Sequence, residues 1–250
     1  MSTESSSTTE RAAEILIHLG AAGSDGLSLQ ALSQHLGGAK SAVRRGLIAL
    51  SKSGFVENAG RYGHYRLGPA IFGLANRPSS TIELVRRYRP ALAEVAAVTQ
   101  QASYLMVRAG FDAICIDMHE GTAFVQTLTG GIGGRVPLGI GPGSISLLTL
   151  LDTRLANSTI DHNAARFERY NGADTTKVRQ TLERARMLGY SYDIGETFPD
   201  AGGVGVPVVA SWGKTAAAIS IAIPASLLNP KRAAEIATEI RAAISACPSA

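Results

Sequence analysis

The chain has 250 residues, 45% of them hydrophobic and 18% charged, which excludes a disordered chain and predicts two globular domains. Its longest chargeless run, from Val136 to Leu151, is interrupted by prolines and glycines and is too short to span a membrane. The net charge of +4 is uneven, because residues 1–90 hold 11 Lys and Arg against 6 Asp and Glu, and the remainder 13 against 14. Such asymmetry points to a part that faces nucleic acid, joined to a neutral part.

Two cysteines, Cys115 and Cys247, are too few for a disulfide framework or a four-cysteine zinc site. The first ten residues are rich in Ser and Thr and have neither the basic region nor the apolar stretch of a secretory signal. We therefore expect a cytoplasmic protein without a membrane contact, with residues 1–10 as a disordered tail.

Residues 11–76 have the pattern of a winged helix-turn-helix domain. Apolar residues recur at helical spacing from Ala12 to Leu19, and Ser28 can cap a second short helix that Gly37 and Gly38 end. A third helix is expected over residues 39–53, followed by a hairpin over 55–67 with its turn at Ala59 and Gly60. This order of helices and hairpin is that of a winged helix-turn-helix.

Residues 77–250 form the second expected domain, of α+β class. A capping-box pattern at Ser80 opens a helix to about Thr99, with Pro90 as a kink or restart, and the segment 77–99 serves as a linker helix. Strands are expected at 103–108, 113–118, 124–129, 190–192, 205–209 and 216–223, a glycine-rich loop at 130–144, and helices at 145–151, 177–188 and 230–246. The mixture predicts a sensor-type domain around a mainly antiparallel sheet.

The third helix of the first domain has the two faces of a DNA-recognition helix. Val43, Leu47 and Leu50 cluster on one side, and polar and basic side chains occupy the other. Arginine suits bidentate contact with guanine, a serine at the helix start suits a phosphate, and an arginine at the hairpin tip can reach a minor groove or the backbone. The candidate DNA-contacting residues are Ser28, Lys40, Ser41, Arg44, Arg45 and Arg61. Each arginine taken alone is more often a solvated surface residue, and the combination with two preceding short helices and a wing favours DNA binding.

The stretch GLSLQALSQHLGGAKSAVRRGLIALSKSGFVENAGRYGHYRLG resembles the DNA-binding domain of IclR-type bacterial transcription regulators. The later stretches IGGRVPLGIGPG, RARMLGYSYDIGE, GVGVPVV and AAAISIAIP resemble the effector-binding domain of that family, in the same order. The resemblance implies a winged helix-turn-helix followed by a GAF-like α/β effector-binding and oligomerisation domain. It also implies an operator in double-stranded DNA, a small organic acid as effector, a homodimer or homotetramer, and no cofactor or metal. Gly46 replaces a residue that is usually large and apolar in the family.

Carried over from the family, the effector pocket would be formed by Pro142, Gly143, Ser144, Asp193, Gly203, Ser220 and Ala222. Glycines allow backbone N–H groups to approach an anion, and Ser144 can cap the helix that follows. Ser220 and Ala222 lie two residues apart and face one side of their strand. The alternative for Asp193 is an ordinary turn residue, and for Ser220 a hydroxyl bonded within the sheet. Gly203 and Ala222 suggest a roomy pocket for an aromatic or longer acid.

An enzyme acting on a small organic acid in the C-terminal domain is the alternative function. Cys115, Asp117 and His119 alternate along one strand and would then share a face, as a nucleophile or metal trio would need. Buried cysteines are more often small hydrophobic residues. The chain contains no G-x-S-x-G, H-E-x-x-H or phosphate-binding loop. The sequence therefore favours a ligand-controlled DNA-binding regulator and no catalytic residues.

Overall fold

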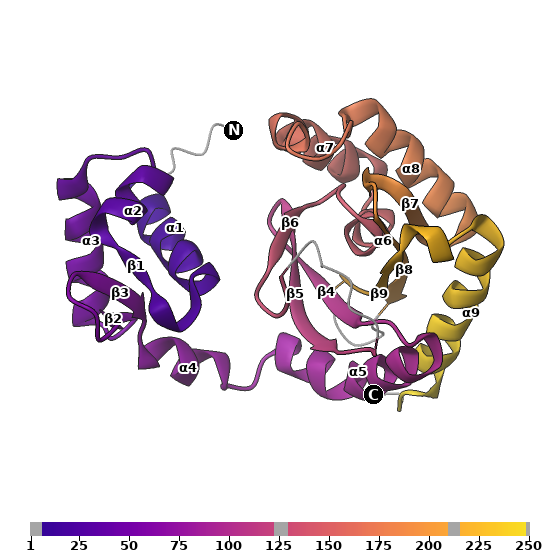
Figure 1. Ribbon diagram of the computed structural model, residues 1–250, viewed down its shortest axis with the longest axis horizontal. Helices are drawn as coiled ribbons and strands as arrows, with labels where there is room; N and C mark the ends of the chain where they lie inside the picture. The colour runs from indigo at the N-terminus through magenta and orange to yellow at the C-terminus, as the bar shows by residue number, and fades with distance from the viewer. Residues whose placement is uncertain (1–6, 123–129, 210–215, 249–250) are drawn as a thin grey trace. The chain divides into compact units, whose positions relative to one another are not determined.

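The computed structural model describes residues 7–122, 130–209 and 216–248 (Figure 1). The chain divides into two compact units, and the division falls between Pro78 and Ser79. No helix within the described ranges has the length and apolar character of a membrane span. Each unit has its own hydrophobic core.

The first unit packs three helices against a small antiparallel sheet. Its elements are α1 (Ser7–Ala21), a 3₁₀ turn (Gly23–Asp25), β1 (Leu27–Ser28), α2 (Leu29–His35), α3 (Lys40–Lys52), β2 (Val56–Asn58), β3 (His64–Leu67) and α4 (Pro69–Ala75). The strand order is β1-β3-β2, so β3 is the central strand and the β2–β3 hairpin forms the wing. The core side chains are Ile15, Leu19, Leu32, Val43, Leu47 and Val56. The predicted winged helix-turn-helix is therefore present.

Two details of this unit bear on its helices. The first helix starts at Ser7, so residues 7–10 are helical and are not part of the expected disordered tail. Gly46 of α3 lies against α1, where an added Cβ would be 2.8 Å from Cδ1 of the buried Ile15. The glycine thus allows the close approach of the recognition helix to α1, although glycine is a poor residue for a helix interior.

The second unit is built on one six-stranded antiparallel sheet with the order β6-β5-β4-β9-β8-β7. The strands are β4 (Ser103–Ala109), β5 (Asp112–His119), β6 (Arg135–Pro137), β7 (Ser191–Phe198), β8 (Ala201–Val209) and β9 (Ala216–Pro224). The helices are α5 (Ser80–Thr99), α6 (Pro142–Thr149), α7 (Thr153–Phe167), α8 (Thr175–Leu188) and α9 (Pro230–Ala246), with a 3₁₀ turn at Ala225–Leu227. The expected α+β class with a mainly antiparallel sheet is confirmed.

Helices cover the two faces of this sheet in two groups. Helices α5 and α9 pack on one face, around Leu92, Leu105 and Ile219. Helices α6, α7 and α8 cover the other face, around Met106, Leu147 and Phe167 (Figure 1). Alternation along each strand sends successive side chains to these two cores.

Several elements differ from the sequence-based expectation. Helix α6 begins at Pro142 instead of Ile145, and β6 lies within the segment expected to be loop. Helix α7 was not predicted, because its buried face includes the polar Thr159 and Asn163 and so interrupts the apolar pattern. The strand expected at 124–129 lies outside the described residues.

Strand β5 contains a β-bulge that changes which face its side chains occupy. Met106 of β4 pairs with Cys115, but Leu105 pairs with Asp117, so the register shifts by one residue at Ile116. Cys115 therefore faces the α6 side of the sheet with Met106, whereas Asp117 reaches α5. The expectation that Cys115, Asp117 and His119 share a face is wrong, because strict alternation fails at the bulge.

Candidate nucleic-acid interface and effector cavity

The recognition helix α3 presents a cationic face opposite its buried face. Val43 and Leu47 are buried in the first core, while Lys40, Arg44 and Arg45 are exposed. This division fixes the pose of the helix through its apolar side and leaves long donors free to reach a ligand. The fold therefore brings these three predicted residues onto one exposed surface.

These cations have no carboxylate partners among the described residues. Lys40, Arg44, Arg45 and the wing residue Arg61 form no ion pair there, whereas the other wing arginine, Arg66, is held 2.8 Å from Glu57. An uncompensated cation keeps its full attraction for a phosphate. Figure 1 shows the β2–β3 wing beside α3 within this unit.

The start of α3 and the start of α2 differ in how their backbone donors are used. Helix α3 has no side-chain cap, and exposed Ser41 lies in its first turn, where N–H groups lack helical acceptors. At α2, the Ser28 hydroxyl accepts a hydrogen bond from the N–H of Ala31 at 3.1 Å. Ser28 therefore serves as the helix cap that the sequence predicted, with its O–H left to donate.

A cavity of about 580 Å³ lies on the α6 face of the sheet in the second unit. Its walls come from β4, the glycine-rich loop, the first turn of α6, the β7–β8 connection and β9. Of the seven predicted pocket residues, Pro142, Gly143, Ser144, Asp193, Ser220 and Ala222 line it. Segments distant in the sequence are thus brought together around one cavity.

Ser220 and Gly143 form the tight end of this cavity. A Cβ added at Gly143 would lie 2.8 Å from Oγ of Ser220 and 3.1 Å from Cγ of Met106. Among the described residues, the Ser220 hydroxyl has no hydrogen-bond partner, although its residue is 7% exposed. The absence of a side chain at Gly143 therefore allows the first turn of α6 to pack directly against Ser220 and Met106 at the wall of the cavity.

Two of the predicted pocket residues, Ser144 and Asp193, have structural roles. The hydroxyl of Ser144 donates to the carbonyl oxygen of Ile140 at 2.7 Å and accepts from the N–H of Gly139 at 3.1 Å. The Asp193 carboxylate accepts hydrogen bonds from the backbone of Glu196 and Thr197 and from the Thr197 hydroxyl. Asp193 thus orders the turn between this cavity and a second cavity of about 530 Å³ beside α8.

Gly203 is the one predicted pocket residue that does not line the cavity. A Cβ there would lie 2.5 Å from the carbonyl oxygen of Ile221 and 3.3 Å from Cγ of Pro142. The glycine allows Pro142 of α6 to lie close to β8, and the family-based assignment of Gly203 as a ligand contact stays a prediction.

Polar donors gather at the α6 end of the cavity. Gly143 and Ser144 occupy the first turn of α6, and their N–H groups donate to no carbonyl in the part of the chain that the structure describes. Ile145 is the first residue of the helix whose N–H is bonded, to the carbonyl oxygen of Gly141. Two open N–H groups near the Ser220 hydroxyl can hold a carboxylate, and the positive end of the helix dipole favours that charge.

Sequence reasoning missed most of the apolar wall. Tyr104 and Met106 of β4, Val136 of β6 and Phe198 of β7 line the cavity, together with Ile140 of the loop. Tyr104 and Met106 alternate with residues of the opposite core, so the period-two pattern could have placed them on the pocket face. Their pairing with Ser220 and Ala218 across β9 becomes visible only in the sheet.

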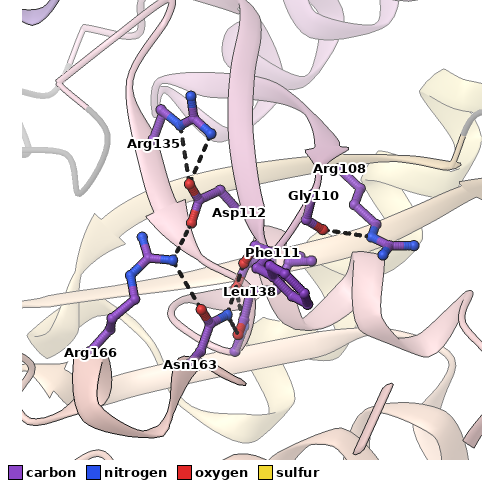
Figure 2. A network of polar contacts seen from close by, with 10 residues as sticks. Arg108, Gly110, Phe111, Asp112, Arg135, Leu138, Asn163 and Arg166 are labelled. Carbon is purple, nitrogen blue, oxygen red and sulfur yellow. Dashed lines mark hydrogen bonds and ion pairs between the residues drawn. The ribbon is translucent and has the colours of Figure 1, made fainter. Parts of the chain in front are cut away.

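A buried polar network holds the loop that leads into the cavity (Figure 2). The side-chain amide of Asn163 on α7 donates to the carbonyl oxygens of Phe111, at 2.8 Å, and Leu138, at 3.1 Å. Asp112, next to Phe111, pairs with Arg135 at 2.9 Å and Arg166 at 2.6 Å. Since Leu138 begins the segment that runs to α6, the network fixes one end of the cavity loop.

The suggested nucleophile or metal trio is not assembled. Burial raises the pKa of the Cys115 thiol to about 12, which keeps it protonated and unreactive at neutral pH. Asp117 is engaged on the other face with Arg89. Within the described ranges, His, Cys, Asp and Glu side chains form no group of three or more that could hold a metal ion.

Comparison with known proteins identifies both units. The family model of the IclR helix-turn-helix domain matches residues 8–60, and that of the C-terminal domain of bacterial transcriptional regulator IclR matches residues 78–247. Both models describe transcriptional regulators, and neither describes a catalytic family.

Curated relatives and solved structures agree with these matches. The chain is 26% identical over 224 residues to the transcriptional repressor AllR of Klebsiella pneumoniae, covering 89% of this chain and 82% of that protein. It is 26% identical to the regulator KipR of Bacillus subtilis over 198 residues, covering 78% of each.

Two crystal structures share the fold along nearly the whole chain. One is an IclR homologue from Microbacterium hydrocarbonoxydans complexed with 4-hydroxybenzoate, with a TM-score of 0.75, 21% identity and coverage of 95% of this chain and 97% of that one. The other is a regulator from Alicyclobacillus acidocaldarius, with a TM-score of 0.72, 21% identity and coverage of 96% and 97%. From its two matched domains and their fold, the chain belongs to the IclR family of bacterial transcriptional regulators, with a DNA-binding and an effector-binding domain.

Proposed function

We propose that this regulator binds its operator through α3 and the wing, as a dimer or tetramer, and that an aromatic organic acid in the α6 cavity controls the binding. The observation that carries the proposal is the chemistry of the cavity. One end offers the open N–H groups of Gly143 and Ser144 and the Ser220 hydroxyl, and the walls are largely apolar or aromatic. A carboxylate at the polar end and a ring against Tyr104 and Met106 satisfy both parts.

The size of the cavity favours a ring over a two-carbon acid. Ala222 and Ser220 project from β9 into a space of about 580 Å³, within the range of small-molecule pockets. A ligand of two or three carbons would leave most of the apolar wall uncovered. The relative from Microbacterium hydrocarbonoxydans was crystallised in complex with 4-hydroxybenzoate, which supports an aromatic acid as the ligand class.

The operator contacts are assigned to the unpaired cations. Arg44 and Arg45 reach base edges from α3, Lys40 and Ser41 bind phosphate at its start, and Arg61 contacts the backbone or minor groove from the wing tip. Ser28 supports this surface by capping α2 and can donate its O–H to a phosphate.

Self-association is supported by the short helix α4. Its sequence, PAIFGLA, has no charge and no buried residue, and Phe72 and Leu74 are 73% and 57% exposed. One DNA-binding unit makes few phosphate contacts, so useful affinity requires at least two copies on a partly palindromic site. A second copy of the chain that packs on α4 would bury this apolar surface. It would also supply a DNA-binding unit for the second half-site.

The DNA interface is tested with genomic fragments from upstream of the neighbouring genes. Wild-type full-length protein selects the operator, and dissociation constants are then measured for Arg44→Ala/Arg45→Ala, Arg61→Ala and the control Arg66→Ala. We expect the loss of a base contact to cost roughly 1–3 kcal/mol and to relax specificity at one position, whereas Arg61→Ala weakens all sequences evenly. Arg66→Ala removes the same charge from a residue already paired with Glu57. Wild-type affinity of the double variant at moderate salt would refute the assignment.

The ligand class is tested by thermal shift. The melting temperature of the wild-type protein is measured with benzoate, 4-hydroxybenzoate, acetate or pyruvate. Benzamide, the uncharged analogue of benzoate, is the control for the carboxylate. A ligand present at 100 times its dissociation constant stabilises the folded state by about 2.7 kcal/mol. We expect the aromatic carboxylates to raise the melting temperature and benzamide to have little effect. Stabilisation by acetate alone would refute the aromatic class.

A further inference from the structure

Pro90 divides helix α5 into two halves. In the sequence, this helix follows the DNA-binding unit and precedes the first strand of the six-stranded sheet. Proline lacks an N–H, so no helical hydrogen bond reaches the carbonyl of Arg86, and the helix is weakest at this turn. The half after Pro90 is firmly packed, with Ala91, Leu92, Val95, Ala96 and Thr99 buried. The half before it buries only Leu84 and Tyr88. The half nearer the DNA-binding unit in sequence is therefore the less firmly held.

An ion pair holds α5 to the sheet immediately before Pro90. Arg89 donates to both oxygens of Asp117, from Nε at 3.0 Å and from Nη2 at 3.2 Å. The Asp117 side chain is only 4% exposed, and Arg89 is its only hydrogen-bond partner among the described residues. A bidentate pair fixes direction as well as distance. We call this contact the Arg89–Asp117 clamp.

The β5 bulge makes the clamp possible. Cys115 faces the α6 side, so strict alternation would send Asp117 to that side as well, away from α5. The extra residue at Ile116 turns Asp117 towards α5 instead. Burying the Asp117 carboxylate costs desolvation free energy, and removing the arginine would leave that charge buried and unpaired.

The same bulge borders the effector cavity through β4. The register shift falls between Leu105 and Met106, and Met106 and Tyr104 line the cavity on the opposite face of the sheet from α5. A ligand in contact with Met106 therefore touches β4 at the point where its pairing with β5 shifts. This shift determines the side of the sheet on which Asp117 lies. Neighbouring Ser103 provides a second tether, donating to the carbonyl oxygen of Leu92 at 2.8 Å, one turn after Arg89.

We propose that Asp117 is a positioning residue, and that the Arg89–Asp117 clamp transmits occupancy of the cavity to the half of α5 before Pro90. Ligand contact with Met106 and Tyr104 adjusts the β4–β5 bulge, which moves Asp117 and with it Arg89. The Ser103 tether keeps the second half of α5 fixed, so the change is confined to the half that leads to the DNA-binding unit. The transmission step rests on the proposed effector function, whereas the holding role of the clamp does not.

Hydrogen exchange of the ligand-free, full-length protein tests the holding role. Arg89→Gln removes the charge from the clamp, and Arg89→Lys restores one ionic contact. Arg86→Gln is the control on the same half of α5, since the ion pair of Arg86 within the described residues is with Glu83. We expect amides 83–89 to exchange about fivefold to tenfold faster in Arg89→Gln, with amides 92–99 unchanged. Arg89→Lys should recover part of the protection, and Arg86→Gln should match wild type. Equal exchange in Arg89→Gln and wild type would overturn the clamp.

Operator affinity with and without 4-hydroxybenzoate tests the transmission. A wild-type response in the usual range of about fivefold to 150-fold should fall below about threefold in Arg89→Gln and stay intact in Arg86→Gln. Calorimetry should give 4-hydroxybenzoate affinities within about threefold of each other for the three proteins. A wild-type response in Arg89→Gln would overturn the transmission. Absence of any response in wild-type protein would instead contradict the proposed effector class, and ligand-free exchange alone would then decide the clamp.

Discussion

Gly46 and Ile15 offer a stability test in which the structure predicts a change of sign. Gly46→Ala adds a methyl group to the interior of α3, which by helix propensity alone would stabilise the helix by about 1 kcal/mol. The new Cβ would lie 2.8 Å from Cδ1 of Ile15, well inside the roughly 3.5–4.0 Å of a normal carbon contact. Ile15 is completely buried, so its methyl group has no solvent side to which it can turn.

The magnitudes follow from these two opposing effects. Overpacking typically costs 1–3 kcal/mol, so Gly46→Ala should destabilise this unit by about 1 kcal/mol net. Ile15→Val removes the obstructing Cδ1 and alone should cost about 1 kcal/mol. In the double variant the new methyl group fills the space that Cδ1 left, and its stability should return close to wild type. Alanine at position 46 is thus harmful beside isoleucine and beneficial beside valine.

Native-state hydrogen exchange of the α1 and α3 amides in the full-length protein measures this cycle. A loss of 1 kcal/mol lowers protection about fivefold. We expect lower protection in each single variant and near-wild-type protection in the double variant. Higher protection in Gly46→Ala alone, or strictly additive losses in the double variant, would show that Gly46 does not set the approach of α3 to α1.

Three further predictions concern other parts of the chain. Asn163→Ala leaves the carbonyl of Leu138 without its side-chain donor and removes one of two donors from the carbonyl of Phe111, which keeps the N–H of Leu138, so urea unfolding should show the second unit destabilised by about 1–3 kcal/mol; a change under 0.5 kcal/mol would contradict the role of the network. Cys115 should resist iodoacetamide at pH 8 in the native protein and react after denaturation, as mass spectrometry can show, because burial raises its pKa to about 12. Phe72→Glu should shift light scattering towards smaller species at micromolar concentration, and an unchanged mass would exclude α4 from the interface.

Local signals in the sequence were sufficient for the first unit. Ser28 as a cap, the Val43 and Leu47 stripe and the glycine at the end of α3 each depend on residues a few positions apart. The structure has each of them, because short-range hydrogen bonds and helical periodicity determine these features. The start of α1 differs, where Ser and Thr at 7–9 are helical although their composition suggested disorder, and the short strand β1, which adds a third strand to the predicted hairpin, was not expected.

The second unit was harder to predict where contacts are distant in sequence. Asn163 appears polar and exposed in the sequence, and its partners lie 25 and 52 residues away. Alternation placed Ser220 and Ala222 correctly on one strand face, but the same rule failed for Asp117, because a bulge leaves no clear mark in a single sequence. Ser144 and Asp193 were found at the cavity, yet only the structure shows that their oxygens are already bonded.

The most direct test of effector control is operator affinity with and without saturating 4-hydroxybenzoate, for wild-type protein, Ser220→Ala and Gly143→Val. The Ser220 hydroxyl has no hydrogen-bond partner within the described residues, and the Cβ of a valine at position 143 would lie 2.8 Å from its Oγ, with the two methyl groups extending into the same wall of the cavity. We predict that the ligand changes wild-type affinity by about fivefold to 150-fold, that both variants lose most of this response, and that all three bind operator equally without ligand. A variant that responds as wild type does would place the effector outside this cavity and contradict the account.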